Sequence, residues 1–234
     1  MIIHTIREKY PDVVIQACAS GGGRMNYGLL PYFDECWLSD NNDAFERVKK
    51  QYGASLFLPA NALATHVGSS PDHTTGRIVP IKYRTDVAMN GRMGLELLPQ
   101  NMTETEKQQT KRAIADYKLL RKTIQTGQQY RLRSPYDNDG IAATMYLDSD
   151  TQAVLLVYQT TTDENTGSIN LHLCHLPDGV SYMIEEKNVA IGETASSPNG
   201  KIVDAETLKT EGLTIPLSRQ YASRVYLLTP VGRK

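Results

Sequence analysis

The sequence predicts an α/β region followed by an all-β region, and two observations lead to this fold class. In the first 127 residues short apolar runs alternate with patterns of helical period, which is typical of βαβ units and a parallel sheet. After Gly127 short apolar segments are separated by turn-rich clusters, which is typical of an antiparallel β-sandwich. We therefore expect two domains, residues 1–127 and residues 128–234.

Four strands are expected in the first region, after a short helix that ends near Tyr10. Their apolar runs are residues 13–17, 35–38, 55–58 and 93–97. Between the second and third runs we expect a helix, because apolar residues recur there at helical spacing. Asn41 and Asn42 can cap its start, and Gly53 is placed to end it.

The helix expected over residues 104–126 has the clearest signals of the chain. Thr103 and Glu106 have the spacing of a capping box, and Gly127 follows at a position where helices commonly end. Its apolar face is formed by Ala113, Tyr117, Leu120 and Ile124. Beyond it, the strands expected in the all-β region are residues 130–132, 143–147, 153–158, 169–173, 182–184 and 224–228.

The first region contains about four βα units, which is half of what a closed (β/α)8 barrel requires. An open half barrel would expose two strand edges and an apolar inner face. We therefore expect this region either to pair with another piece or to be a fragment of a longer protein.

Composition and charge exclude several classes of protein. The formal net charge is −1 with acidic and basic residues interspersed, so nucleic acid is not an expected partner. No segment approaches the roughly 20 apolar residues of a membrane span. The three cysteines do not suggest a disulfide framework, and the N-terminus lacks the apolar core of a signal peptide. A cytoplasmic location is therefore expected, without membrane association.

A glycine-rich segment follows the first expected strand. Cys18, Ala19 and Ser20 lead into three successive glycines that begin at Gly21. Glycines at the carboxyl end of a parallel strand let a ligand approach the main chain. A surface turn is the alternative interpretation, and the phosphate-loop spacing GxxxxGK[ST] is absent.

Asp40 lies where the second expected strand ends and a helix begins. An acidic residue at the carboxyl end of a barrel strand lies at the face where barrel active sites are built, so Asp40 is a candidate proton donor or base. In the alternative interpretation Ser39, Asp40 and Asn42 only cap the helix. Trp37, the only tryptophan, could form a platform against a sugar ring or be packed in the core.

Histidines occur in a polar loop after the third expected strand. His66, Asp72 and His73 have no standard zinc spacing, so a hydrogen-bonded loop is the better interpretation than a metal site. His172 and His175 flank Cys174 in a β segment, where structural roles are expected.

Five ordered blocks of sequence resemble the distal barrel and following segment of bacterial α-galactosidases of glycoside hydrolase family 36. The blocks begin CxSGGGR, WxSDNxDAxER, HVxxxPxHxxGR, VAMxGxxGxEL and YKxxRxxIQxG, and they occupy residues 18–30, 37–59, 66–77, 87–97 and 117–135. The resemblance is strong over about residues 10–136 and weak beyond them. It implies the second half of a TIM barrel followed by a C-terminal antiparallel β-sandwich.

The resemblance also implies retaining hydrolysis of terminal α-linked galactose from oligosaccharides such as melibiose and raffinose, with no metal or organic cofactor. It places the acid/base of the family at Asp40 and the sugar-binding loop at Cys18, Ala19, Ser20 and Gly21. The chain is also expected to associate, either with copies of itself as a homo-oligomer or with the missing N-terminal half.

The nucleophile of the family lies in a KWDxNR-like segment, and none of these 234 residues form one. Because a retaining mechanism needs both carboxylates, the isolated chain is expected to have little or no activity. Asn26 and Asn42 also replace the usual aspartate and threonine of the family, which could alter the pocket. Two alternatives remain open: a carbohydrate-binding or structural remnant, and α-N-acetylgalactosaminidase specificity on the same scaffold.

Overall fold

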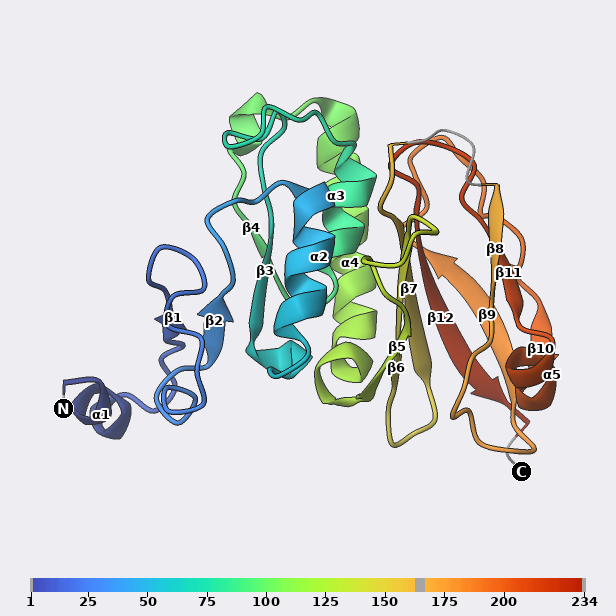
Figure 1. Cartoon of the computed structure of the whole chain (residues 1–234), viewed down its shortest axis with the longest axis horizontal. Coiled ribbons are helices and arrows are strands. Elements are labelled where there is room, and N and C mark those ends of the chain that lie inside the picture. The colour runs from blue at the N-terminus through green and yellow to red at the C-terminus, as the bar shows by residue number, and fades with distance from the viewer. Residues whose placement is uncertain (1, 163–166, 233–234) are drawn as a thin grey trace.

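A parallel sheet at one end of the molecule and a larger antiparallel sheet at the other are separated by a layer of helices (Figure 1). This computed structural model describes residues 2–162 and 167–232. Within those ranges, no helix has both the length and the apolar character that crossing a membrane requires. The α/β region is thus followed by a β-rich region, as the sequence predicts.

The first sheet has four parallel strands in the order β1-β2-β3-β4. These strands are β1 (Gln16–Ala17), β2 (Glu35–Trp37), β3 (Leu63–Val67) and β4 (Arg92–Leu95). The helices of this region are α1 (Ile2–Lys9), α2 (Ala44–Ala54), α3 (Ile81–Ala88) and α4 (Glu104–Thr126), with short 3-10 turns at Ala60–Ala62 and Pro99–Asn101. Figure 1 shows α2, α3 and α4 between the two sheets.

The strand predicted over residues 55–58 is wrong. This segment forms turns that continue from α2, in which the amides of Leu56 and Phe57 donate to the carbonyls of Gly53 and Ala54. The side chain of Leu56 is 65% exposed, so the apolar run does not mark a buried strand. The third strand is β3, in which Thr65 and His66 interrupt the apolar residues and weaken the apolar signal.

The helix ends differ in part from the predictions. Asp43, and not Asn41 or Asn42, is the N-cap of α2, because its side chain accepts a hydrogen bond from the Phe45 amide. The capping box at the start of α4 is confirmed, with Thr103 and Glu106 bonded reciprocally. Helix α3, with a buried mixed polar and apolar sequence, was not predicted.

The second sheet has six antiparallel strands in the order β10-β9-β12-β7-β6-β5, and β8 and β11 form a separate pair. The strands are β5 (Gln128–Arg133), β6 (Ile141–Leu147), β7 (Ala153–Gln159), β8 (Ser168–Leu171), β9 (Ser181–Lys187), β10 (Ile202–Asp204), β11 (Leu213–Pro216) and β12 (Ser223–Val231). A short helix, α5 (Ala205–Thr210), joins β10 to β11. All six predicted segments fall mostly or wholly in strands, whereas β10, β11 and α5 were not predicted.

The inner strands β6 and β7 of the six-stranded sheet are buried on both faces. Leu155 and Val157 of β7 lie in a core that includes residues of β8, β11 and α5. Leu156 and Tyr158, which point to the opposite face, lie in a core with residues of α3 and α4. This double cover explains why β7 is continuously apolar instead of alternating.

A buried polar network joins α3 to the large sheet. The carboxylate of Asp86 accepts hydrogen bonds from Lys82, from the Ser223 hydroxyl and from the Asn188 amide group. Asn188 accepts in turn from the side chain of Gln109 on α4. Since Asp86 is fully buried, these bonds tie the helical layer to the sheet at a point that water does not reach.

Candidate functional site

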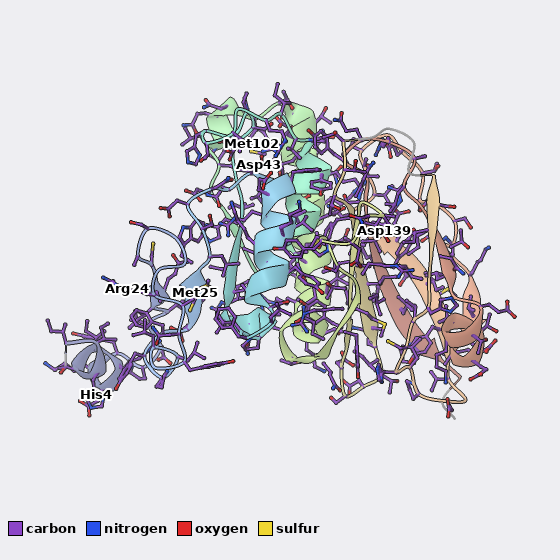
Figure 2. The ribbon with its side chains drawn as sticks, in the orientation of Figure 1. His4, Arg24, Met25, Asp43, Met102 and Asp139 are labelled. Carbon is purple, nitrogen blue, oxygen red and sulfur yellow. The ribbon has the colours of Figure 1, made fainter. Side chains whose placement is uncertain are left out.

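The carboxyl ends of the four parallel strands lead into loops at one edge of the sheet, which is where α/β proteins build their sites. The loop after β1 contains the glycine run, the loop after β2 contains Asp40, and Glu96 directly follows β4. Figure 2 shows Asp43 and Met102, which follow β2 and β4 in the chain, at the same end of the helical layer. The described strands therefore bring three separate sequence blocks to one edge.

Gly21 packs the glycine loop directly against the Asp40 segment. Its φ of +78° favours glycine, and a Cβ built there would lie 2.9 Å from the Ser39 Cα and 3.2 Å from the Asp40 nitrogen. No other residue fits this approach without displacing backbone. The residues before it, Cys18 and Ser20, are exposed, and Ala19 is half-buried. The loop and Asp40 were predicted to form one site, and in the structure they are adjacent.

Asp40 is exposed and does not cap α2. Its Oδ1 atom accepts a hydrogen bond from the Trp37 indole nitrogen at 3.1 Å. The capping bonds nearby belong to other residues: Ser39 accepts from the Asn41 amide, and Asn41 accepts from the Asp43 amide. The carboxylate of Asp40 is therefore open to solvent on one side and fixed by a single donor on the other.

Trp37 is 7% exposed and has neighbours on its ring. The guanidinium carbon of Arg47 lies 4.7 Å from the ring centroid, and the imidazole of His66 lies 4.5 Å away, edge-on at 61°. Of the two alternatives that the sequence left open for Trp37, the structure shows core packing of the ring. Its N–H points to Asp40.

Arg47, on α2, is 1% exposed and was not singled out from the sequence. Its Nη2 donates to the side-chain oxygen of Asn42, while Nε and Nη1 are buried without a hydrogen-bond partner among the described residues. Burial lowers the pKa of Arg47 to about 10, against the opposing effect of Glu96, Asp40 and Asp72. The guanidinium stays charged at neutral pH.

Glu96 links the loops after β2 and β4. It accepts a hydrogen bond of 2.7 Å from the Asn42 amide group, and its Oε2 lies 3.7 Å from the His66 Nδ1. Burial lowers the pKa of His66, although Glu96 opposes this. Gly94 leaves room for the imidazole, because a Cβ there would lie 2.4 Å from His66. Arg47 and Glu96 are the arginine of WxSDNxDAxER and the glutamate of VAMxGxxGxEL, so the resembling blocks contain both residues but do not indicate their contacts.

The loop after β3 is held together by hydrogen bonds. The Oδ1 atom of Asp72 accepts from the amides of Thr74 and Thr75, and the hydroxyl of Thr75 donates to Asp43 at 2.8 Å. Arg77 pairs with the same Asp43 carboxylate. Across the part of the chain that the structure describes, no group of three or more His, Cys, Asp or Glu residues is arranged to hold a metal ion.

Comparison with known families identifies both regions of the chain. Residues 1–127 match the model of the family described as Melibiase. The chain belongs to the melibiase family. Residues 141–228 match the model described as the glycosyl hydrolase family 36 C-terminal domain, which confirms the resemblance drawn from the five sequence blocks.

Similar curated proteins include α-galactosidases of bacteria and fungi. Alpha-galactosidase AgaA of Geobacillus stearothermophilus is 38% identical over 193 residues, which cover 82% of this chain and 26% of that protein. Probable alpha-galactosidase C of Aspergillus flavus is 35% identical over 228 residues, or 97% of this chain and 29% of that protein. This melibiase chain thus spans between a quarter and a third of the length of these relatives.

Solved structures of α-galactosidases have the same fold over this length. The α-galactosidase AgaB of Geobacillus stearothermophilus superimposes with a TM-score of 0.87 at 33% identity, covering 98% of this chain and 30% of that one. The α-galactosidase of Lactobacillus brevis gives a TM-score of 0.88 at 28% identity, covering all of this chain and 31% of that one. The α/β-then-β arrangement is therefore shared with known members of the family.

Proposed function

We propose that this chain supplies the acid/base half of an α-galactosidase site, which hydrolyses terminal α-linked galactose with retention of configuration. The observation that carries the proposal is the position of Asp40: an exposed carboxylate at the carboxyl end of β2, beside the glycine loop and fixed by the Trp37 N–H. Membership in the melibiase family supports the assignment.

In the proposed mechanism Asp40 protonates the leaving glycosidic oxygen and later removes a proton from the attacking water. A second carboxylate, about 5 Å away, attacks the anomeric carbon in retaining enzymes. The segment that would provide this nucleophile is not among the 234 residues of the chain. We therefore propose that turnover requires a carboxylate from outside them.

The sugar would lie against the loop of Cys18, Ala19, Ser20 and Gly21. Cys18 and Ser20 are exposed and Ala19 is half-buried, so this part of the loop would meet the galactose hydroxyls, whereas Gly21 is buried and holds the loop against the Asp40 segment. Trp37 would contribute its indole edge, since Arg47 lies over the ring. Raffinose is the proposed type of substrate, and a family 36 relative has been solved in complex with it. The proposed mechanism assigns no role to a metal or organic cofactor.

The fold supports a larger assembly. We propose that β1 to β4 form the second half of a (β/α)8 barrel within residues 1–127, and that residues 128–234 form a C-terminal antiparallel β-sandwich. The half barrel would be completed by the remaining part of a longer α-galactosidase, and the whole would form a cytoplasmic homo-oligomer.

The test is a chimera in which this chain replaces the matching region of Geobacillus stearothermophilus AgaA, assayed with a chromogenic α-galactoside. We expect turnover by the chimera and little or none by the isolated chain. Asp40→Asn should lower kcat of the chimera by at least about a hundredfold, the lower end of what a general acid/base contributes.

The matched control is Asp12→Asn, which alters an exposed aspartate away from the strand ends and should leave kcat unchanged. An Asp40→Asn chimera with the activity of its parent would contradict the assignment of Asp40. Rapid hydrolysis by the isolated 234 residues would contradict the need for a second carboxylate. A preference for the N-acetylgalactosaminide substrate would favour the alternative specificity.

A further inference from the structure

A closed ring of side-chain contacts lies behind Asp40. The ring passes from Arg47 to Asn42, from Asn42 to Glu96, from Glu96 to His66, from His66 to Trp37 and back to Arg47. Its members come from β2, the loop after β2, α2, β3 and the position directly after β4. Asp40 is attached to the ring at one point, through the Trp37 N–H.

The burial of Arg47 is not explained by an ion pair. No carboxylate lies within salt-bridge distance of its guanidinium among the described residues, and two of its three nitrogens lack a hydrogen-bond partner there. Glu96, Asp40 and Asp72 favour its charged form only from a longer distance. Taking a cation out of water is costly, so an apolar side chain would serve simple packing better. The guanidinium must contribute something that an apolar side chain does not.

Its contribution follows from its shape. A guanidinium is planar and can lie over an indole ring while it donates a hydrogen bond in its own plane. Arg47 does both, toward Trp37 and toward Asn42. With His66 edge-on to the same ring, the indole is prevented from rotating about its side-chain bonds.

The orientation of the indole decides where the Asp40 carboxylate is held. Tryptophan has a single N–H donor, and its direction is fixed by the plane of the ring. Asp40 is exposed, so a free aspartate side chain would sample several rotamers. A fixed indole N–H selects the Asp40 rotamer in which Oδ1 lies 3.1 Å from the Trp37 nitrogen.

We propose that Arg47 is a positioning residue for Asp40, acting through the plane of the Trp37 indole. The inference rests on the proposed role of Asp40 as acid/base, and it adds a residue to that site which has no contact with the sugar. Catalytic groups must be held within a fraction of an ångström of their productive geometry, which supporting residues of this kind provide.

The experiment uses the single tryptophan of the full 234-residue chain. In a ¹⁵N-labelled sample the indole N–H gives one cross peak, whose shift reports the hydrogen bond to Asp40. A double-mutant cycle combines Asp40→Ala with Arg47→Met, which keeps a long side chain but removes the charged plane. Asp40→Ala should move the peak and speed its exchange with water about tenfold in the parent chain. In the Arg47→Met background the same change should have almost no effect.

Two further variants make the result decisive. Arg84→Met removes another buried arginine, which pairs with Glu106 and does not touch Trp37, and it should leave the effect of Asp40→Ala intact. If Arg47→Met does not fold, Arg47→Lys replaces it, because lysine keeps the charge but cannot lie flat on the ring. The proposal is overturned if Asp40→Ala moves the peak equally with and without Arg47. The cycle involves no turnover, so a failed galactosidase assay would not affect its outcome.

Discussion

Strands β7 and β1 belong to different sheets and differ in how completely this chain covers them. All seven residues of β7 are buried, under α3 and α4 on one face and under β8, β11 and α5 on the other. Strand β1 has two residues, and Val13 and Val14 just before it are 48% and 59% exposed. The chain therefore completes the packing of its antiparallel sheet, whereas its parallel sheet keeps apolar surface open to further contacts.

The largest effect is expected where the helical layer meets the antiparallel sheet. Asp86→Ala removes the acceptor of Lys82, Ser223 and Asn188, and leaves the ammonium of Lys82 buried without its partner. Breaking a buried pair in this way costs about 3–5 kcal/mol. Urea denaturation should show a loss of that size in the free energy of unfolding.

The control for this variant is Asp150→Ala, which breaks the ion pair of Lys122 and Asp150, both about two-thirds exposed. We expect no measurable change in the free energy of unfolding, because water screens such a pair. Equal losses in the free energy of unfolding for the two variants would contradict this expectation. The polar network between the helices and the sheet would then contribute no more than an exposed ion pair.

A slightly smaller loss is expected inside the sheet. Leu155→Ala on β7 removes a fully buried side chain and leaves a cavity, which costs about 2–5 kcal/mol. Leu56→Ala, at a 65% exposed position in the turns after α2, should change the free energy of unfolding by less than about 0.5 kcal/mol. Thermal and urea denaturation of both variants would measure the contrast, and a large loss for Leu56→Ala would show that its surface is covered in solution.

The cap of α4 tests the helical layer itself. Thr103→Ala removes the hydroxyl that accepts from the Glu106 amide and should cost about 1 kcal/mol. Thr103→Ser retains the hydroxyl and is the matched control, with a smaller loss expected in the same denaturation experiment. If alanine and serine behaved alike, the cap would not contribute to the stability of the layer.

The smallest effect concerns Asp34, which holds the N-terminal segment to the parallel sheet. Burial raises the pKa of Asp34. Hydrogen bonds from the Ile15 amide and from Arg7 lower it by more than burial raises it, so the net shift is downward. A carboxyl with a lowered pKa in the folded state stabilises the fold fully above its unfolded pKa. This contribution is lost as the pH falls through the folded value.

We therefore expect Asp34→Asn to reduce the free energy of unfolding by at most about 1 kcal/mol at pH 7, with the difference from the parent shrinking as the pH falls below the unfolded pKa of about 4. Urea denaturation across this pH range measures it. Asp12→Asn, at an exposed position, should show no such trend. A difference that grew on acidification would contradict the sign of the shift.

The sequence predicted the antiparallel sheet better than the parallel one, for a physical reason. Strands such as β7 carry apolar residues on both faces, and this signal does not depend on the rest of the fold. Strand β3 contains Thr65 and His66 among its apolar residues, while the neighbouring segment at Leu56 is more apolar but exposed. Local hydrophobicity therefore favoured the wrong segment, because burial here is decided by tertiary packing.

The site was predictable only in part. The glycine loop and Asp40 were identified because each follows a strand and because their order in the sequence resembles a known family. Arg47 and Glu96 lie within the same resembling blocks, but a residue that acts through contacts with three other segments has no local signature. The cap at Asp43 was also missed, since several of its neighbours are equally good capping residues.

The cover that α3 and α4 give to the antiparallel sheet has a consequence for how such proteins can be rearranged in evolution. A recombination event at the junction of α4 and β5 would transfer a sheet with one bare apolar face, and the recipient would gain a surface prone to aggregation. The segment that can be exchanged between proteins as one heritable module must therefore begin before α3. Any such exchange also carries β4 and Glu96, which lie between α3 and α4, so the C-terminal region and this part of the site are inherited together.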